Sequence, residues 1–179
     1  MHTFEIFDNL VNRSNANQIE DILLSQDFPW FYIKKSSGDA ERVDGYSDTV
    51  QFEHHFFFFV FQTSQLFLCE LLNLNDVLKK TGLQNKVLRV KSNLLLKTQK
   101  TPNTPHIDFS QPHFVLLYYV NDSDGPTTFY EKSEKSFKKI KQVTPKKGRF
   151  VLFDGNTYHS STPPQKNDCR CVININVLP

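Results

Sequence analysis

Apolar residues in the first third of the chain follow short, separate patterns. Thr3–Phe7 alternates apolar and polar residues, which is typical of a strand. Asn15 and Gln18 form a capping pair ahead of apolar residues at helical spacing, so we expect a helix from about residue 16 to residue 25. The segment Lys34–Ser47 is rich in Ser, Gly and charge, which predicts a surface loop.

An aromatic segment and a second helical pattern follow. Val50–Phe61 alternates only at its start and is then apolar on both faces, as expected of a buried central strand. Its adjacent histidines, His54 and His55, would point to opposite faces of a strand, which favours packing or hydrogen bonding over a shared metal ion. Leucines at helical spacing after Thr63 and Ser64 predict one capped helix that continues to about residue 80.

From residue 86 onward, short strand patterns alternate with the turns N-D-S-D-G-P, P-K-K-G and D-G-N. This regular spacing predicts a mainly β fold with flanking helices, arranged as a double-stranded β-helix, the cupin-like jelly roll. We expect one domain over 1–179, in which 1–84 is a supporting layer and 85–179 is the jelly-roll core. The predicted strands are 87–98, 113–120, 127–130, 136–143, 149–153 and 169–177.

Strand alternation makes a further prediction for the last strand, C-R-C-V-I-N-I-N-V. If Arg170 faces the interior of the barrel, then Val172, Asn174 and Asn176 do so as well. The opposite face of this strand is apolar and needs a cover, which the N-terminal helices would supply. The same alternation in H-F-V-L-L-Y-Y-V lets Tyr119 reach the interior beside Arg170.

Three side chains have the spacing of a metal centre. His106 and Asp108, in T-P-H-I-D-F, lie two positions apart in an extended segment, so both can bind one ion. His159, in F-D-G-N-T-Y-H, follows after enough chain for several short strands. Two imidazoles and one carboxylate leave open positions on a divalent ion, as in non-haem Fe(II) oxygenases. Arg170 suits a dicarboxylate cosubstrate, because a guanidinium pairs a carboxylate through two hydrogen bonds.

These motifs resemble those of the 2-oxoglutarate and Fe(II)-dependent oxygenases, specifically the small prolyl-4-hydroxylase-like branch with phage-encoded and bacterial members. The resemblance covers about Val90 to the end in the family's order, through T-P-H-I-D-F, L-L-Y-Y-V-N-D-S-D-G-P-T-T-F, P-K-K-G-R-F-V-L-F-D-G-N-T-Y-H-S and R-C-V-I-N-I-N-V. It implies that His106, Asp108 and His159 bind iron. It also implies that Arg170 holds the far carboxylate of 2-oxoglutarate.

Further site residues follow from the resemblance and from the alternation. Tyr119 matches a tyrosine that adds a hydroxyl contact to the far carboxylate. Asn174 and Asn176 are candidates for lining the cosubstrate or substrate pocket, and His113 is a candidate for a supporting or substrate-side role. Relatives often carry a Tyr on the strand before H-x-D, where this chain has Leu94–Leu96. We therefore expect a different lining at the near end of the cosubstrate or at the substrate entrance.

The activity implied by the resemblance uses Fe(II), 2-oxoglutarate and O2. It hydroxylates an unactivated C–H bond, on a prolyl or other amino-acid side chain, and releases succinate and CO2. One alternative is a non-catalytic jelly-roll binding module, for example a virion component, with a vestigial metal site. A third reading, a nucleobase-directed oxygenase, would call for a second Arg and a basic groove, whereas the last strand has one Arg.

The composition of the chain narrows the range of partners that we expect. A net charge of +2 gives no electrostatic case for nucleic acid. The aromatic run at 56–61 is far shorter than the ~20 residues that span a bilayer. Three cysteines without disulfide-like spacing suit a reducing compartment, and the N-terminus has no signal-peptide pattern. We expect a cytoplasmic protein that acts on a peptide, a protein or a small amino-acid-like molecule.

Overall fold

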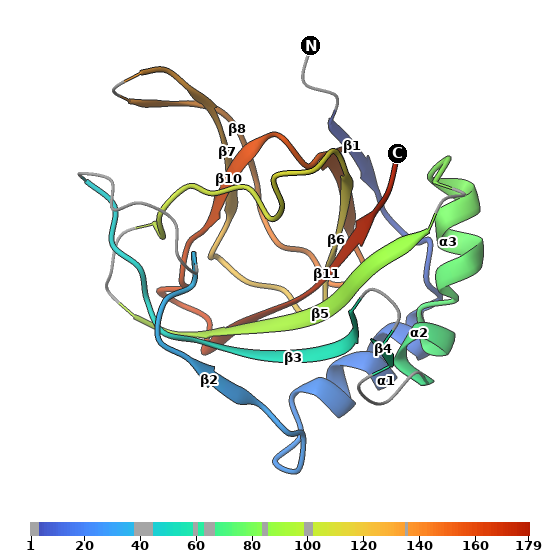
Figure 1. Ribbon diagram of the computed structural model, residues 1–179. Coiled ribbons are helices and arrows are strands. Elements are labelled where there is room, and N and C mark those ends of the chain that lie inside the picture. Colours follow the sequence, from blue (N-terminus) through green and yellow to red (C-terminus); the bar gives the residue numbers. More distant parts are fainter. Residues whose placement is uncertain are drawn as a thin grey trace.

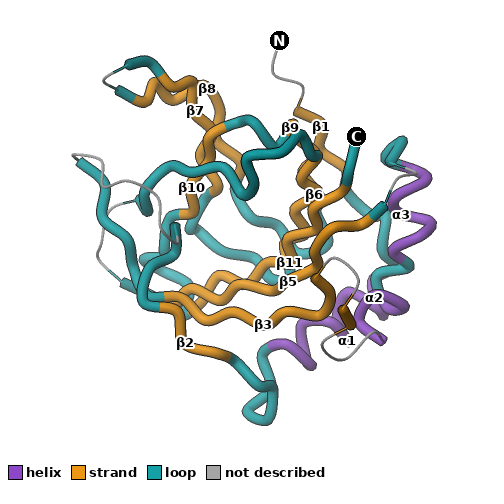
Figure 2. The backbone as a smooth tube through the Cα atoms, viewed as in Figure 1, coloured by secondary structure: helices purple, strands orange, loops and turns teal. Residues whose placement is uncertain are grey.

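The computed structural model of the protein describes residues 4–37, 45–58, 61–62, 67–83, 86–98, 102–134 and 136–179 (Figures 1 and 2). The helices are α1 (Arg13–Leu23), α2 (Phe67–Leu71) and α3 (Leu74–Lys80). The strands are β1 (Phe4–Phe7), β2 (Phe31–Ile33), β3 (Gln51–Phe58), β4 (Phe61–Gln62), β5 (Val87–Leu96), β6 (Phe114–Tyr119), β7 (Thr127–Lys132), β8 (Phe137–Val143), β9 (Phe150–Asp154), β10 (Tyr158–Ser161) and β11 (Cys169–Val177).

Within these residues the strands form two sheets. The major sheet has the order β1-β9-β6-β11-β5-β3-β2, with β4 paired to β3, and the minor sheet has the order β10-β7-β8. All of these pairings are antiparallel. The three helices gather on one side of the major sheet, and the minor sheet lies on the other side (Figure 1). The predicted mainly β architecture with flanking helices is confirmed.

The last strand, β11, lies in the middle of the major sheet and separates two apolar cores. Its row Cys171, Ile173, Ile175 and Val177 is fully buried and packs in one cluster with Ile19 and Leu23 of α1 and Leu68 of α2. Val172, on the opposite face, packs between the sheets with residues of β6, β7, β8 and β9. The predicted alternation of β11, with one face covered by the N-terminal helices, is therefore confirmed.

The helices begin and end differently from the predictions. Helix α1 starts three residues earlier than expected, because the side chain of Asn12, and not that of Asn15, caps it by accepting from Asn15 N at 2.9 Å. The expected single helix after residue 63 is two helices, since Asn73 adopts the left-handed conformation (φ 48°, ψ 50°), which Asn tolerates well. The predicted cap at Thr63 or Ser64 and part of the 34–47 loop lie outside the described residues.

The two adjacent histidines of β3 serve different faces, as predicted. His54 is buried and shares a hydrogen bond of 2.8 Å with Pro29 O, and its ring lies 4.8 Å from that of Phe28. His55 Nε2 lies 3.3 Å from Glu53 Oε2. None of the described helices is long and apolar enough to cross a membrane.

A buried ion pair joins β3 to β5 on the inner face of the major sheet. Lys91 Nζ and Gln51 Nε2 each donate to Glu53 Oε1 at 2.6 Å, and only about a tenth of either charged side chain is exposed (11% for Lys91, 12% for Glu53). Burial alone would raise the pKa of Glu53, but hydrogen bonds and charges from His55 and Lys91 lower that pKa to about 2. The carboxylate is thus bound more tightly in its charged form.

The central position of β11 predicts a large effect of Ile173→Ala. Because Ile173 is fully buried, we expect this change to lower the free energy of unfolding by about 2–5 kcal/mol. Ile140→Ala on β8, where the side chain is 37% exposed, should change it by less than about 0.5 kcal/mol. Urea denaturation of both variants measures the difference, and equal midpoints would contradict the assignment of β11 to the core.

The Glu53 pair predicts a defined pH dependence of stability. A folded pKa of about 2 against an ordinary value of 4.5 stabilises the fold above pH 4.5, by at most about 3 kcal/mol. This contribution is lost as the pH falls from 4.5 toward 2. The stability advantage of wild type over Glu53→Gln should therefore be greatest at neutral pH and shrink through this window. The exposed Glu131→Gln serves as control, and an advantage independent of pH would refute the assignment.

Candidate functional site

Backbone pairing brings the two predicted histidines together. His106 N donates to His159 O and His159 N donates to His106 O, both at 3.0 Å. Asn103 supports this junction, because its side chain donates to Ser161 Oγ at 3.0 Å and accepts from Thr49 N at 2.8 Å. The segment that precedes β6 is thereby attached to β10 of the minor sheet, a strand that was not among those predicted from the sequence.

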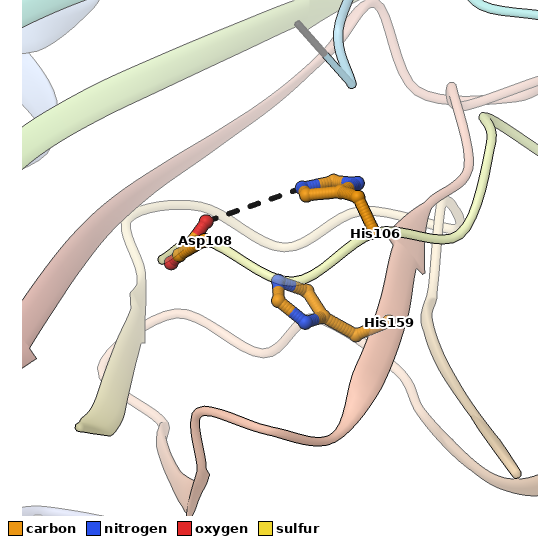
Figure 3. A group of neighbouring side chains, drawn as sticks. All are labelled: His106, Asp108 and His159. Atoms are coloured by element: carbon orange, nitrogen blue, oxygen red, sulfur yellow. Dashed lines mark ion pairs between the residues drawn. The ribbon is translucent and has the colours of Figure 1, made fainter. Parts of the chain in front are cut away.

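The side chains of His106, Asp108 and His159 converge on one point (Figure 3). Each offers one ligand atom, and these atoms all lie within 4.8 Å of one another. Metal–ligand bonds of about 2.0–2.2 Å place ligand atoms up to about 4.4 Å apart. The three side chains are therefore close to the spacing that one divalent ion requires.

Hydrogen bonds on the far side of each imidazole set its tautomer. His106 Nδ1 bonds to Thr104 O and His159 Nδ1 bonds to Thr157 O, both at 3.1 Å. A carbonyl oxygen only accepts, so in each neutral ring Nδ1 carries the hydrogen and Nε2 keeps its lone pair. Both Nε2 atoms are then ready to bind a metal ion, as in proteins that orient metal-binding histidines in this way.

The carboxylate of Asp108 is held through one of its two oxygens. Asn176 Nδ2 donates to Oδ2 at 2.7 Å and Asn174 Nδ2 donates to it at 2.9 Å. Arg89 Nη2 lies 3.3 Å from the same oxygen, within ion-pair distance although not aligned for a hydrogen bond. The other oxygen, Oδ1, lies 4.0 Å from His106 Nε2.

Electrostatics keep the cluster in a metal-binding protonation state. Burial alone would raise the pKa of Asp108, but the charge of Arg89 and the neighbouring imidazoles hold it well below its usual range. Burial and the nearby His106 lower the pKa of His159 to about 4. At neutral pH, Asp108 is charged and His159 is neutral, and these are the forms that bind metal ions.

A buried cation lies on the same strand as the two asparagines. Arg170 is 3% exposed, and its guanidinium donates to Gly125 O at 2.9 Å and to Thr127 Oγ1 at 2.7 Å. Asn121 holds the backbone on both sides of it, by accepting from Cys171 N at 2.8 Å and donating to the carbonyl of residue 169 at 3.1 Å. Among the described side chains, no carboxylate lies within ion-pair distance of Arg170.

An isolated buried cation is costly, so this arrangement favours an anionic ligand. Tyr119 is fully buried, its hydroxyl donates to Thr127 Oγ1 at 2.8 Å, and its ring lies 5.7 Å from the Arg170 guanidinium. Burial raises the pKa of Tyr119, so its hydroxyl stays protonated. Because Thr127 Oγ1 accepts from both Tyr119 and Arg170, its own hydrogen remains available for a carboxylate.

The remaining predicted residues lie in distinct places. Asn174 and Asn176 both contact Asp108. His113 is buried and packs edge-on against Phe109 at 5.4 Å, so the structure places it against that ring and outside the three-residue cluster. Among the leucines that stand where relatives often carry a Tyr, Leu95 is 1% exposed and pairs in register with Arg170.

Sequence reasoning missed Arg89 and Thr127. Arg89 faces the interior because β5 pairs with β11 so that Arg89 lies opposite Asn176. Alternation along β5 would have shown this only if the pairing had been known. Thr127 follows the G-P turn, and its role depends on contact with two other strands, for which the sequence carries no local signal.

Comparison with known proteins agrees with this geometry. A sequence model of the 2OG-Fe(II) oxygenase superfamily matches residues 94–178, which include all three converging side chains and Arg170. No curated protein sequence matches the chain.

Solved structures show the same fold. AviO1 from Streptomyces viridochromogenes Tue57 has a TM-score of 0.69 at 11% identity, over 99% of this chain and 90% of that chain. The α-ketoglutarate-dependent epimerase SnoN from nogalamycin biosynthesis has a TM-score of 0.65 at 11% identity, over 99% and 79%. A prolyl hydroxylase from Trichoplax adhaerens, solved with a peptide fragment of hypoxia inducible factor, has a TM-score of 0.63 at 15% identity, over 98% and 83%.

These similarities confirm the predicted double-stranded β-helix, and at such identities they speak for the fold alone. The region matched by the family model includes the two histidines and the aspartate that the structure brings together, and it also includes Arg170. The cofactors predicted from the motifs, Fe(II), 2-oxoglutarate and O2, agree with that match and with the arrangement of donors. Over residues 94–178 the chain matches the 2OG-Fe(II) oxygenase superfamily, and its fold and its converging His, Asp and His side chains support an enzyme of this kind.

Proposed function

We propose that His106, Asp108 and His159 bind Fe(II) and that the protein hydroxylates an unactivated C–H bond of an amino-acid side chain. One observation carries the metal assignment: one ligand atom from each of the two imidazoles and one carboxylate oxygen all lie within 4.8 Å of one another. Each of these ligand atoms is oriented by a hydrogen bond that another atom of the same side chain makes. Surface His and Asp residues that meet by chance would not share such support.

The cosubstrate assignment rests on the buried Arg170. We assign the far carboxylate of 2-oxoglutarate to its guanidinium, with the hydroxyls of Tyr119 and Thr127 as additional donors. Leu95 and Val172 line the same interior and exclude water from the charged pair. Exclusion of water strengthens each of these electrostatic contacts.

The bound iron supplies the oxidising chemistry, in which 2-oxoglutarate and O2 yield succinate and CO2 and one oxygen atom enters the substrate C–H bond. The chain contributes orientation and charge. The paired imidazoles and the ionised Asp108 hold the ion, and the donors around Arg170 fix the direction from which the keto acid approaches. Three protein ligands would leave positions on the ion open to the keto acid.

The substrate class is a further part of the proposal. A peptidyl proline or another amino-acid side chain is supported by the shared fold with a prolyl hydroxylase that was solved with a peptide. SnoN, with the same fold, is an epimerase from nogalamycin biosynthesis, so the fold also accepts small molecules. A nucleobase substrate finds less support, because the chain carries a net charge of only +2.

Turnover without substrate tests the catalytic proposal against the binding-module alternative. With Fe(II), wild type should form succinate from 2-oxoglutarate in an O2-dependent reaction, and His106→Ala should lower this rate at least about 100-fold because one of three metal ligands is lost. The matched control His55→Ala, on β3, should keep the wild-type rate. Succinate formation is measured by mass spectrometry. If wild type shows no turnover, or if His106→Ala turns over at the same rate, the result would favour a non-catalytic module.

Binding of 2-oxoglutarate tests the role of Arg170 separately. Arg170→Gln removes the positive charge and the paired N–H donors of the guanidinium. The dissociation constant for 2-oxoglutarate should therefore rise about 100-fold or more. Calorimetry on Mn(II)-loaded protein measures this without turnover. Arg13→Gln, at the exposed start of α1, is the control and should bind as wild type does. Unchanged affinity in Arg170→Gln would place the cosubstrate elsewhere.

A further inference from the structure

Of the two carboxylate oxygens of Asp108, Oδ2 has no lone pair left for a metal ion. Oδ2 receives hydrogen bonds from Asn176 at 2.7 Å and from Asn174 at 2.9 Å, and the Arg89 guanidinium lies 3.3 Å away. A carboxylate oxygen has two lone pairs, and both amide donors already occupy them. Oδ1 faces His106 Nε2 and is the oxygen left for the ion.

Arg89 is itself held in place on two sides. Its Nε donates to Asn176 Oδ1 at 2.9 Å, and its guanidinium lies 4.5 Å from the centre of the Phe109 ring. Since a guanidinium only donates, Asn176 must present its oxygen to Arg89 and its amide nitrogen to Asp108. Asn176 is therefore fixed in one orientation and links the arginine to the carboxylate.

Charge gives this link a second function. The side chain of Asp108 is 6% exposed and that of Arg89 is 10% exposed, so each buried charge depends on the other. Without the arginine, the carboxylate would be free to turn its second oxygen toward the ion. That second oxygen would then take a position on the ion that the keto acid would need.

We infer that Arg89 and Asn176 are positioning residues that make Asp108 bind its metal ion through Oδ1 alone, with Asn174 as an additional donor. This inference rests on the proposed metal site. Arg89 lies outside the 94–178 region that matches the family, and β5 brings it to the site through pairing with β11. The arginine therefore adds to the metal site a support that the matched region does not contain.

Metal affinity tests the inference without turnover. Calorimetric titration with Mn(II) should show a dissociation constant about 10- to 100-fold higher for Arg89→Gln than for wild type. Arg89→Lys keeps the charge but loses the fixed fork, so its affinity should lie between the two. Lys138→Gln, which removes an exposed cation of β8, is the control and should stay within about threefold of wild type.

A spectroscopic measurement separates positioning from general damage to the fold. The anaerobic Fe(II)–2-oxoglutarate complex should show a charge-transfer absorption band that shifts in Arg89→Gln, and circular dichroism should show native secondary structure. If Arg89→Gln does not fold, Asn176→Ala decides the question, because it keeps the arginine and removes the link; its Mn(II) affinity should fall about tenfold.

The outcomes distinguish the two proposals. Failure of wild type to bind Mn(II) would overturn the metal site itself. If wild type binds Mn(II) and folded Arg89→Gln shows unchanged affinity and an unchanged spectrum, the positioning role is overturned and the metal site stands. If Arg89→Gln does not fold, the same result in Asn176→Ala overturns the positioning role.

Discussion

The pair of backbone hydrogen bonds between His106 and His159 is the constraint on which the site depends. His159 belongs to the minor sheet, whereas Asp108 is held by asparagines of β11 in the major sheet. His106 connects the two, because its backbone pairs with β10 two residues before Asp108. The cluster of His106, Asp108 and His159 therefore lies where the two sheets meet, and it forms only when both are assembled. Local sequence brings two of the three side chains together, and the tertiary fold adds the third.

Much of this arrangement was accessible from the sequence, for a simple geometric reason. Side chains two positions apart in an extended segment point the same way. This rule predicted that His106 and Asp108 point in a common direction and that Arg170, Asn174 and Asn176 face the interior. Alternation needs no knowledge of the partner strand. The same rule anticipated the apolar outer row of β11 and its cover by helices, because a row of Cys, Ile and Val cannot remain in contact with water.

Features that depend on contacts between distant segments could not be predicted. Arg89 joins the site through a hydrogen bond to a residue far along the chain, and Thr127 acts through two other strands. The break between α2 and α3 was missed because Leu71 and Leu74, on either side of Asn73, keep helical spacing, whereas the backbone of Asn73 itself is left-handed. The start of α1 was placed too late because Arg13 and its neighbours are polar and give no periodic signal.

The central place of β11 has a consequence for how this protein can change over time. One face of the strand is packed into the helix-covered core and the other carries Arg170 and the asparagines that contact Asp108, so few of its positions are free to vary. The outward side of β8, with exposed lysines at 138 and 139, is under no such double demand. We therefore expect evolutionary divergence to accumulate at exposed positions such as those of β8. New specificities can arise there while the strand that carries the site residues stays unchanged.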